Sequence, residues 1–490
     1  MPRDIDQNLI WSVQGFEGGL NTEFPGHALD GTESPDAENF DASVSFALKK
    51  RYGTSNFSGT HSSSSGTVIR GMGAFTPASG TTRFLVKEGT KVYDIQAGNW
   101  TSEVTGATLS DGDQVHFAFY QDTIVMVSEE TTPIAPLKAT TGNFTALGGS
   151  PPSAKYVCLH KGRMFLACTA ADESRVYYSA INNVEDWSTT ANAGNFYVSQ
   201  GDGQSINGIM SDGEVLYISK KSKGTSDPDG SMWAVYGSGP SDFQPARQIA
   251  PFGAVSQRAM GLLESYAVFA SVRGVFAVQG NKISWLSQPV NKTITDLSYA
   301  NAIQMVVGRY KDQLWVAYVS SGSVNNAALV LDITSGRWSR YKTIAAREFA
   351  EHPDGNLYWG YSTTGANTPK VLKYDVSVVA DEGSAITMYW HTPDLEWGQW
   401  FVDKRWQRAV FHVLGTQAVT WTLTHTIDGT ASADNATFVG NVDGPVYLME
   451  GYGPNTEGRF FRFKLAEASS TLQGELYGMM FEAEARPRSR

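Results

Sequence analysis

The stretch KGRMFLAC (Lys161–Cys168) decides the fold, because its form, a short polar turn followed by an apolar strand, recurs along the chain. The segments of this form are TTRFLV, QDTIVMVS, KGRMFLAC, DGEVLYIS, ESYAVFAS, KDQLWVAY and DGNLYWGY. They follow one another at intervals of roughly 40 to 50 residues, which is the spacing of a repeat architecture. A shorter apolar strand precedes each segment and is expected to pair with it as a hairpin.

A third strand follows most of these hairpins, as KVYDI follows TTRFLV. Units of three to four antiparallel strands at this period are typical of β-propeller blades. The sequence therefore predicts a β-propeller over residues 66–380. We expect about seven blades, or six if the first hairpin belongs to a neighbouring barrel.

Aromatic residues close six of the repeats after a turn. We interpret them as wedges between neighbouring blades rather than as a ring of ligand-stacking side chains, because burial between sheets is the commoner use of such rings. These inter-blade aromatics are Trp100, Phe144, Trp187, Phe243, Trp285 and Trp338.

The N-terminal segment, residues 1–65, reads as an extended arm. Between Gly18 and Phe40 it has no helical or strand period, and its apolar anchors are expected to be buried against a neighbouring subunit or another part of the chain; they are Leu20, Phe24, Leu29 and Phe40. The seventh repeat lacks a closing aromatic of its own. The alternating stretch SVSFALKKRYG, with Val44, Phe46 and Leu48 on one face, is predicted to supply its missing strand.

The C-terminal segment, residues 381–490, has a different sequence pattern from the repeats. Five alternating strands separated by Gly and Asp turns, with no blade period, predict a β-sandwich. Four tryptophans gather at its start, and two interpretations stay open for them: a docking or sugar-stacking patch, or the seam between the two domains together with core. The four are Trp390, Trp397, Trp400 and Trp406.

The composition fits a folded, mostly β chain of 490 residues with 12% aromatic residues and 49 glycines. A net charge of −11 without a basic stripe argues against a protein that grips nucleic acid through phosphates. No apolar run approaches the roughly 20 residues that span a bilayer, and the first residues lack the layout of a signal peptide, so we expect a protein made in a cytoplasm.

Catalytic motifs are absent from the sequence. Asp212, Asp312 and Asp354 are candidate carboxylates of a glycosidase, but each lies in a hairpin turn where Asp is favoured for turn geometry. Cys158 and Cys168 are expected to point to opposite faces of one hairpin, which disfavours a disulfide. The sequence predicts no catalytic residue, cofactor or metal ion.

The N-terminal phrase resembles the opening of phage virion proteins of the tail-nozzle and stabilisation type, which begin with GGLNT…P…L…G…SPDAxN and a strand ending in KRxG. The matching residues are Gly18, Gly19, Leu20, Asn21, Thr22, Pro25, Leu29, Gly31, Pro35, Ala37, Asn39, Lys50, Arg51 and Gly53. The closing strands, from Gly458 onward, are similar to those of the same proteins.

The resemblance implies a non-enzymatic structural subunit of a phage tail in the virion. Such nozzles form a homo-oligomeric ring, commonly a hexamer, below an adaptor ring; DNA leaves through the ring during ejection, and fibres, spikes or a plug dock outside it. Two alternatives stay open: a propeller that binds or cleaves carbohydrate for host-surface recognition, and a head fibre or decoration protein of the virion.

Overall fold

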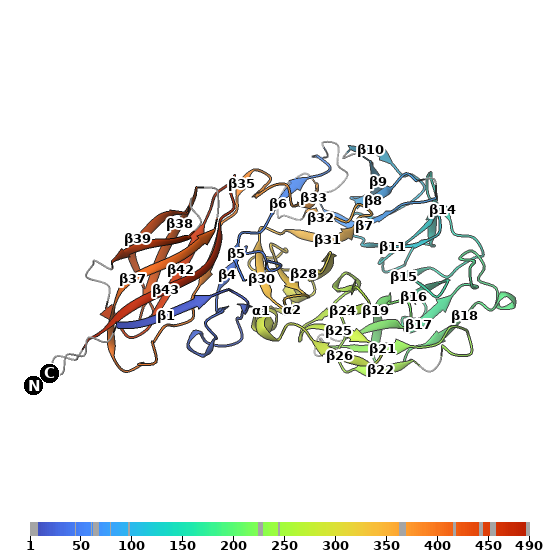
Figure 1. The fold of residues 1–490 in the computed structure, drawn as a ribbon. Helices are drawn as coiled ribbons and strands as arrows, with labels where there is room; N and C mark the ends of the chain where they lie inside the picture. Colours follow the sequence, from blue (N-terminus) through green and yellow to red (C-terminus); the bar gives the residue numbers. More distant parts are fainter. Residues whose placement is uncertain are drawn as a thin grey trace, which may run out of the picture. The chain divides into compact units, whose positions relative to one another are not determined.

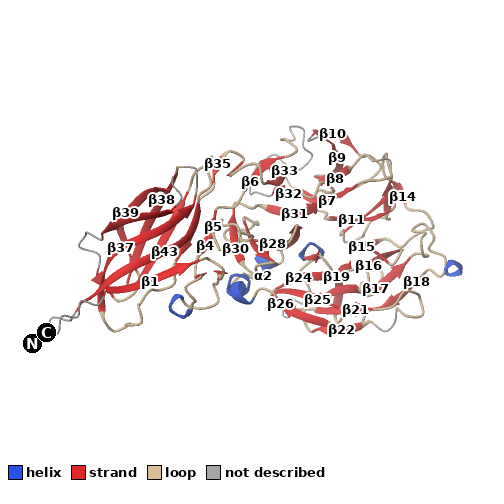
Figure 2. Cartoon of the chain, viewed as in Figure 1, coloured by secondary structure: helices blue, strands red, loops and turns tan. Residues whose placement is uncertain are grey.

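The computed structural model describes residues 8–44, 46–59, 61, 68–78, 80–96, 99–223, 229–243, 246–361, 369–414, 418–440, 444–450 and 457–486. The described chain is built mostly of β-strands, with a few short helices (Figure 2). It forms two compact units. The larger comprises residues 56–328 and 344–374, and the smaller comprises residues 1–55, 329–343 and 375–490. None of the helices in the described part is both long and apolar enough to cross a membrane.

Short antiparallel sheets follow one another through the middle of the chain, and among the described residues most have four strands in sequence order. Their strands are β7 (Ile69–Phe75), β8 (Arg83–Glu88), β9 (Lys91–Gln96) and β10 (Asn99–Glu103); β11 (Val115–Tyr120), β12 (Thr123–Ser128), β13 (Leu137–Ala139) and β14 (Thr145–Ala146); β15 (Ala154–His160), β16 (Arg163–Thr169), β17 (Arg175–Tyr178) and β18 (Gly194–Tyr197); β19 (Gln204–Ser211), β20 (Leu216–Ser222), β21 (Ser231–Val235) and β22 (Arg247–Ala250); β23 (Met260–Leu263), β24 (Tyr266–Ser271), β25 (Gly274–Gln279) and β26 (Lys282–Trp285); β27 (Val306–Tyr310), β28 (Gln313–Tyr318), β29 (Ala327–Asp332) and β30 (Trp338–Lys342); and β31 (Ala346–Glu351), β32 (Leu357–Tyr361) and β33 (Val371–Asp375).

The hairpins that start these sheets follow the pattern of the sequence. In the hairpin of β15 and β16, Lys161 and Gly162 both have positive φ, 45° and 74°, as a two-residue type I′ turn requires. Cys158 pairs with Phe165, and both cysteines are free thiols, as the sequence predicts.

The first strands of the sheets contact one another in cyclic order: β7, β11, β15, β19, β23, β27, β31 and again β7. All of these strands belong to the larger unit, so their inner edges surround a common axis and the fold is β-propeller-like (Figure 1). Close approach on this axis depends on small residues. A Cβ on Gly308 of β27 would come within 2.6 Å of the Phe349 ring of β31.

The strand that completes the last of these sheets is β6 (Gly53–Asn56), which follows β33 in the sheet order. Directly after β6, Phe57 N–H donates to Val371 O at 2.9 Å, and Val371 N–H donates to Ser58 Oγ at 2.8 Å. A strand from the N-terminal segment therefore completes the seventh repeat, as predicted, but it is Gly53–Asn56 and not the predicted stretch around Val44, Phe46 and Leu48.

Val44, Phe46 and Leu48 do not form the completing strand. Phe46 has φ of 63° and is 60% exposed, and Leu48 lies on β5 (Leu48–Lys49), which pairs with β43 (Glu475–Arg486). Of the three residues only Leu48 is fully buried, and it is buried in a different sheet. The strand itself, GTSN, carries no apolar alternation, because its two buried residues are Gly53 and Thr54.

The smaller unit contains two antiparallel sheets. Among its described residues, one sheet orders β1 (Asn8–Gln14), β43, β37 (Asp403–Leu414) and β40 (Gly444–Glu450), with β5 and β41 (Glu457–Gly458) at its margins. The other orders β39 (Thr430–Gly440), β38 (Val419–Ile427), β42 (Phe461–Glu467), β36 (Met388–His391) and β4 (Ala37–Glu38). The first and last strands of the described chain pair in the first sheet, where blue β1 lies beside red β43 in Figure 1.

Aromatic rings join these two sheets. The Phe463 ring of β42 stacks on the Phe481 ring of β43 with centroids 3.9 Å apart, and the Phe411 ring of β37 stacks on Phe438 of β39 at 4.9 Å. Residues 1–55 therefore share a unit with residues 375–490, whereas the sequence-based division set residues 1–65 apart as an arm.

Candidate functional site

Polar and charged side chains converge on the axis of the larger unit, at the end where its first strands begin. They come from five of the sheets: from the first strands, from the residues that flank these strands and, for Glu129, from the end of the second strand β12. We call them the axial cluster: Arg70, Gln114, His116, Glu129, Arg258, Gln304, Arg347 and Glu348.

Hydrogen bonds tie the cluster together across the sheets. Gln114 Nε2 donates to Glu348 Oε2 at 2.8 Å, which links the start of β11 to β31. Arg258, in the 3₁₀ turn η3 (Gln257–Ala259), donates from Nη1 to the backbone O of Arg347 at 2.8 Å. Arg347 Nη1 donates in turn to Gln304 Oε1, just before β27. Side chains more than 200 residues apart in sequence thus lie within one bonded network.

Glu348 occupies an environment that favours its protonated form. Burial raises the pKa of its carboxyl to about 7, although Arg258, His116 and Arg347 favour the charged form. At neutral pH a large share of Glu348 therefore carries a proton that it can donate.

Glu129 occupies the opposite kind of environment. Burial disfavours its charge, but the hydrogen bond between His116 Nε2 and Glu129 Oε1, 2.6 Å long, together with the charges of His116, Arg258 and Lys221, holds the pKa of Glu129 below its usual value. The cluster thus contains one carboxyl with a raised pKa and one with a lowered pKa. Such a divergence separates an acid from a base in many active sites.

The guanidinium groups of the cluster are crowded. Burial and the nearby Arg258 and Arg70 lower the pKa of Arg347 to about 9. Among the described residues, the buried Nε atoms of Arg70 and Arg347 and the Oε1 atom of Gln114 have no hydrogen-bond partner in the protein. Buried polar atoms of this kind are normally satisfied, so these three mark positions where a polar ligand or water would bind.

A cavity of about 280 Å³ continues along the axis from the cluster. Its lining alternates small and apolar residues of β7, β11, β23, β27 and β31, such as Gly73, Phe119 and Gly308, with Arg309 and Glu351. Phe349 lines it directly after the cluster residue Glu348 along the chain, and Met260 lines it two residues after Arg258. The axial cluster and this cavity together form the candidate site of the larger unit.

The aromatics expected between blades occupy different environments. Trp100, Phe144 and Phe243 are buried, and each shares a core cluster with residues of two neighbouring sheets. Trp187 is half-buried against a cluster that joins the β11–β14 and β15–β18 sheets. Trp338, on β30, is fully buried. Trp285 differs, because 47% of its surface is exposed and its ring stacks on Phe276 within its own sheet. A closing position in the repeat therefore does not by itself bury a ring.

The four apolar anchors of the N-terminal arm differ in burial. Leu20 and Phe40 are fully buried within the smaller unit, where the Phe40 ring meets the Trp390 ring at 5.3 Å. Leu29 is half-buried, and Phe24 is 52% exposed. Two of the four anchors are thus already covered by their own chain.

The four tryptophans at the start of the C-terminal segment do not form one patch. Trp390 and Trp406 are buried in the core of the smaller unit. Trp397 is half-buried and packs edge-on against Phe461, whereas Trp400 is 63% exposed. The core interpretation therefore describes two of them, and only Trp400 presents most of its surface to a partner.

Two of the three carboxylates considered from the sequence, those of Asp212 and Asp354, accept hydrogen bonds within their own turns. Asp212 Oδ1 accepts from Glu214 and Val215 N–H, and Asp354 Oδ1 accepts from Asn356 N–H. The sequence analysis missed Glu129 and Glu348, whose separation along the chain hides their convergence. A usable signal existed: a charged or amide residue recurs at the start of the first strand in several repeats.

Comparison with known proteins gives fold-level matches only. No family model matches the chain, and no curated protein matches it. Among solved structures, it is similar to the extracellular domain of a chain assigned to a one-component system of B. thetaiotaomicron, with 8% identity and a TM-score of 0.44 over 86% of this chain and 59% of that one. The chain thus spans under two thirds of that structure's length.

Two further matches are enzymes. An oligogalacturonate lyase in complex with manganese matches with 9% identity and a TM-score of 0.41, over 68% of this chain and 98% of that one. An exo-β-1,3-galactanase from Phanerochaete chrysosporium matches with 11% identity and a TM-score of 0.27, over 84% and 95%. The sequence-based expectation of a non-enzymatic chain is corrected by these matches, because glycoside hydrolases are among the structures that the chain resembles.

Proposed function

We propose that the larger unit is a seven-bladed β-propeller that binds a carbohydrate at the axial cluster and hydrolyses a glycosidic bond there. The observation that carries the proposal is the meeting of two carboxyl groups with opposite environments, Glu129 and Glu348, among arginine side chains beside an axial cavity. Glycosidases generally use one protonated and one ionised carboxyl group in this way.

The chemistry of the two groups is complementary. Glu348 donates its proton to the glycosidic oxygen as the bond from that oxygen to the anomeric carbon breaks. A water molecule adds to the anomeric carbon and gives a proton to the Glu129 carboxylate. Proton exchange with solvent then restores both groups. His116 orients Glu129 through their hydrogen bond.

The charge of the cluster favours an acidic sugar. Three guanidinium groups, those of Arg70, Arg258 and Arg347, face two carboxyl groups, of which Glu348 is partly protonated near neutral pH. Arginine pairs with carboxylates in a planar, two-pronged geometry, so a uronic acid unit fits better than a neutral one.

Reducing-end release from acidic and neutral polysaccharides tests this proposal. We expect cleavage of an acidic polysaccharide, with kcat lowered at least about 100-fold by Glu348→Gln, since general acid catalysis contributes about 10²- to 10⁴-fold. Glu264→Gln, in an exposed hairpin turn of the same unit, is the matched control. Absence of both binding and cleavage across the panel, or an unimpaired Glu348→Gln variant, would overturn it.

We propose as a second candidate that the chain is a virion protein of a phage tail, and that its smaller unit is a β-sandwich. The residues that carry the sequence resemblance support it, because they build the smaller unit. Asn39 Oδ1 accepts from Arg51 Nε and Lys342 N–H, each at 2.9 Å, and Asn39 Nδ2 donates to Thr387 O at 2.8 Å. Arg51 also pairs with Asp381 through both of its Nη atoms.

Under this second candidate the partners are further copies of the chain in a ring, an adaptor protein and a tail fibre, spike or plug. Native mass spectrometry and negative-stain microscopy of the full chain test it. A ring of identical subunits, six by the family resemblance, is expected, whereas a persistent monomer at high concentration would overturn it. This outcome is independent of the carbohydrate assay, because a tail protein can also act on the host surface.

A further inference from the structure

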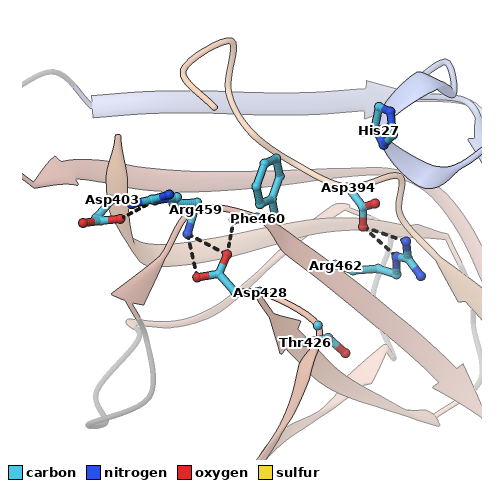
Figure 3. Close-up of a pocket in the computed structure, with 9 residues that line it drawn as sticks. His27, Asp394, Asp403, Thr426, Asp428, Arg459, Phe460 and Arg462 are labelled. Carbon is cyan, nitrogen blue, oxygen red and sulfur yellow. Dashed lines mark hydrogen bonds and ion pairs between the residues drawn. The ribbon is translucent and has the colours of Figure 1, made fainter. Parts of the chain in front are cut away.

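A second cavity, of about 770 Å³, lies in the smaller unit (Figure 3). The N-terminal 3₁₀ turn η1 (Gly26–Ala28) supplies His27 to one side of it, and the C-terminal strands and loops supply the rest. Asp394 N–H donates to Gly26 O at 3.1 Å, which holds the turn against the cavity. The lining residues are His27, Asp394, Asp403, Thr426, Asp428, Gly429, Arg459, Phe460 and Arg462.

Paired charges fix the walls of this cavity. Arg462 Nε donates to Asp394 Oδ1 at 2.8 Å, and Arg459 Nε donates to Asp403 Oδ1 at 3.0 Å. The Asp428 carboxylate accepts from the backbone N–H groups of Arg459 and Phe460. Figure 3 shows these pairs around the Phe460 ring, with His27 on the N-terminal segment.

The arrangement selects a ligand by charge and by shape. Three carboxylates face two guanidinium groups, so the lining is net negative when His27 is neutral, and an anionic ligand would be repelled. The Asp–Arg ion pairs also place further hydrogen-bond donor and acceptor atoms on one concave surface, next to the ring of Phe460. Such a combination suits a ligand with many hydroxyl groups and apolar ring faces.

An aromatic loop adjoins the cavity. It spans residues 395–402 and connects two of the lining residues, Asp394 and Asp403. Leu395 N–H donates to Phe461 O at 2.7 Å, which anchors the start of the loop. Near its C-terminal end, Trp400 is 63% exposed and Phe401 is 59% exposed, with their rings edge-to-face at 5.8 Å. Two large rings on one short loop are costly to expose unless a partner covers them.

We propose that this cavity and the aromatic loop bind a neutral oligosaccharide, whose hydroxyl groups pair with the Asp and Arg side chains and whose ring faces stack on Trp400, Phe401 and Phe460. The site lies entirely within the smaller unit and its ligand differs in charge from the acidic sugar proposed for the axial cluster. It therefore stands whether or not the larger unit hydrolyses carbohydrate.

Titration calorimetry with the full chain tests the proposal, using neutral hexasaccharides of glucose, galactose and mannose, and a galacturonate hexasaccharide. We expect binding of at least one neutral hexasaccharide. Trp400→Ala should raise its Kd about tenfold, which corresponds to about 1.4 kcal/mol. Arg462→Met, which also leaves Asp394 unpaired, should raise the Kd further, and Tyr266→Ala removes a 40% exposed ring of the larger unit as the control.

Three outcomes would overturn the proposal. One is that no neutral hexasaccharide binds, and a second is that Trp400→Ala and Phe401→Ala both leave the Kd unchanged. The third is that Glu348→Gln, rather than the loop variants, abolishes neutral-sugar binding, which would place the ligand at the axial cluster. Because Trp400 and Phe401 are exposed, their variants are expected to fold, and circular dichroism of each variant checks this.

Discussion

The ammonium group of Lys50 lies 2.8 Å from the Glu467 carboxylate, and both side chains are fully buried. Lys50 Nζ also donates to the backbone O of Leu472 at 2.9 Å. Burial lowers the pKa of Lys50 and raises the pKa of Glu467, while their hydrogen bond opposes both changes. This ion pair thus holds the N-terminal segment in the smaller unit. Removing either side chain would leave the charge of the other buried without a counter-charge.

Lys50→Met should destabilise the smaller unit by about 3–5 kcal/mol, because it leaves Glu467 buried without its cation. The double variant Lys50→Met, Glu467→Met should recover much of the loss, since it removes both charges. Urea unfolding of the full chain, followed by tryptophan fluorescence, measures the effect. Lys292→Met breaks the exposed pair with Asp296 and should change stability by under about 0.5 kcal/mol.

Gly53→Ala should destabilise the chain at the strand that completes the last repeat. A Cβ on Gly53 would lie 2.0 Å from the backbone O of Ala380, so one of the two backbone segments must move. We expect a loss of at least about 2 kcal/mol from such overpacking. In Gly112→Ala the new Cβ meets nothing within 4 Å, and the melting temperature should stay within a few degrees of the parent. Equal melting temperatures for the two variants would contradict this close packing of Gly53 against Ala380.

Trp100→Ala and Trp285→Ala should differ sharply, although both rings close a repeat. The Trp100 ring is 7% exposed, stacks on His61 at 4.8 Å and packs with Tyr358 of the neighbouring sheet. Its loss should cost about 3–5 kcal/mol. Trp285 is 47% exposed, so its loss should cost under about 1 kcal/mol. Thermal unfolding of both variants measures this, and similar costs would show that the repeat position rather than burial sets stability.

Side-chain patterns predicted the hairpins well and the closing strand poorly, for a physical reason. Strands such as Arg163–Thr169 can be predicted from the sequence, because residues typical of a turn with positive φ precede a run of residues that become buried. Gly53–Asn56 consists of small and polar residues, and it buries only Gly53 and Thr54, so no apolar pattern in its sequence indicates a strand. Val44, Phe46 and Leu48 alternate with polar or small residues as in a half-buried strand, so the prediction assigned the closing strand to them, which is wrong.

The sequence shows the polar residues that recur at the start of the first strands, but their convergence into the axial cluster depends on ring closure, which the sequence does not show. Gln114 and Glu348 are 234 residues apart and share a hydrogen bond only because β31 returns to β7, which lies beside β11. The aromatic loop could be predicted in part. The sequence shows the run of tryptophans, but which of them is exposed depends on packing. Trp390 contacts Phe16 and Phe40, whereas Trp400 projects from a loop.

The raised pKa of Glu348 makes stability depend on pH in a defined direction. Burial raises that pKa from 4.5 to about 7, so the folded chain binds this proton more tightly than the unfolded chain does. The stabilisation from this group is complete below about pH 4.5, declines as the pH rises, and is lost above about pH 7. Glu348→Gln removes the dependence, so the free energy of unfolding of the parent minus that of the variant should fall by up to about 3 kcal/mol between pH 4 and pH 8. Glu264→Gln, in an exposed turn, should leave the parent profile unchanged, and a Glu348→Gln profile parallel to that of the parent would mean that Glu348 ionises as it does in water.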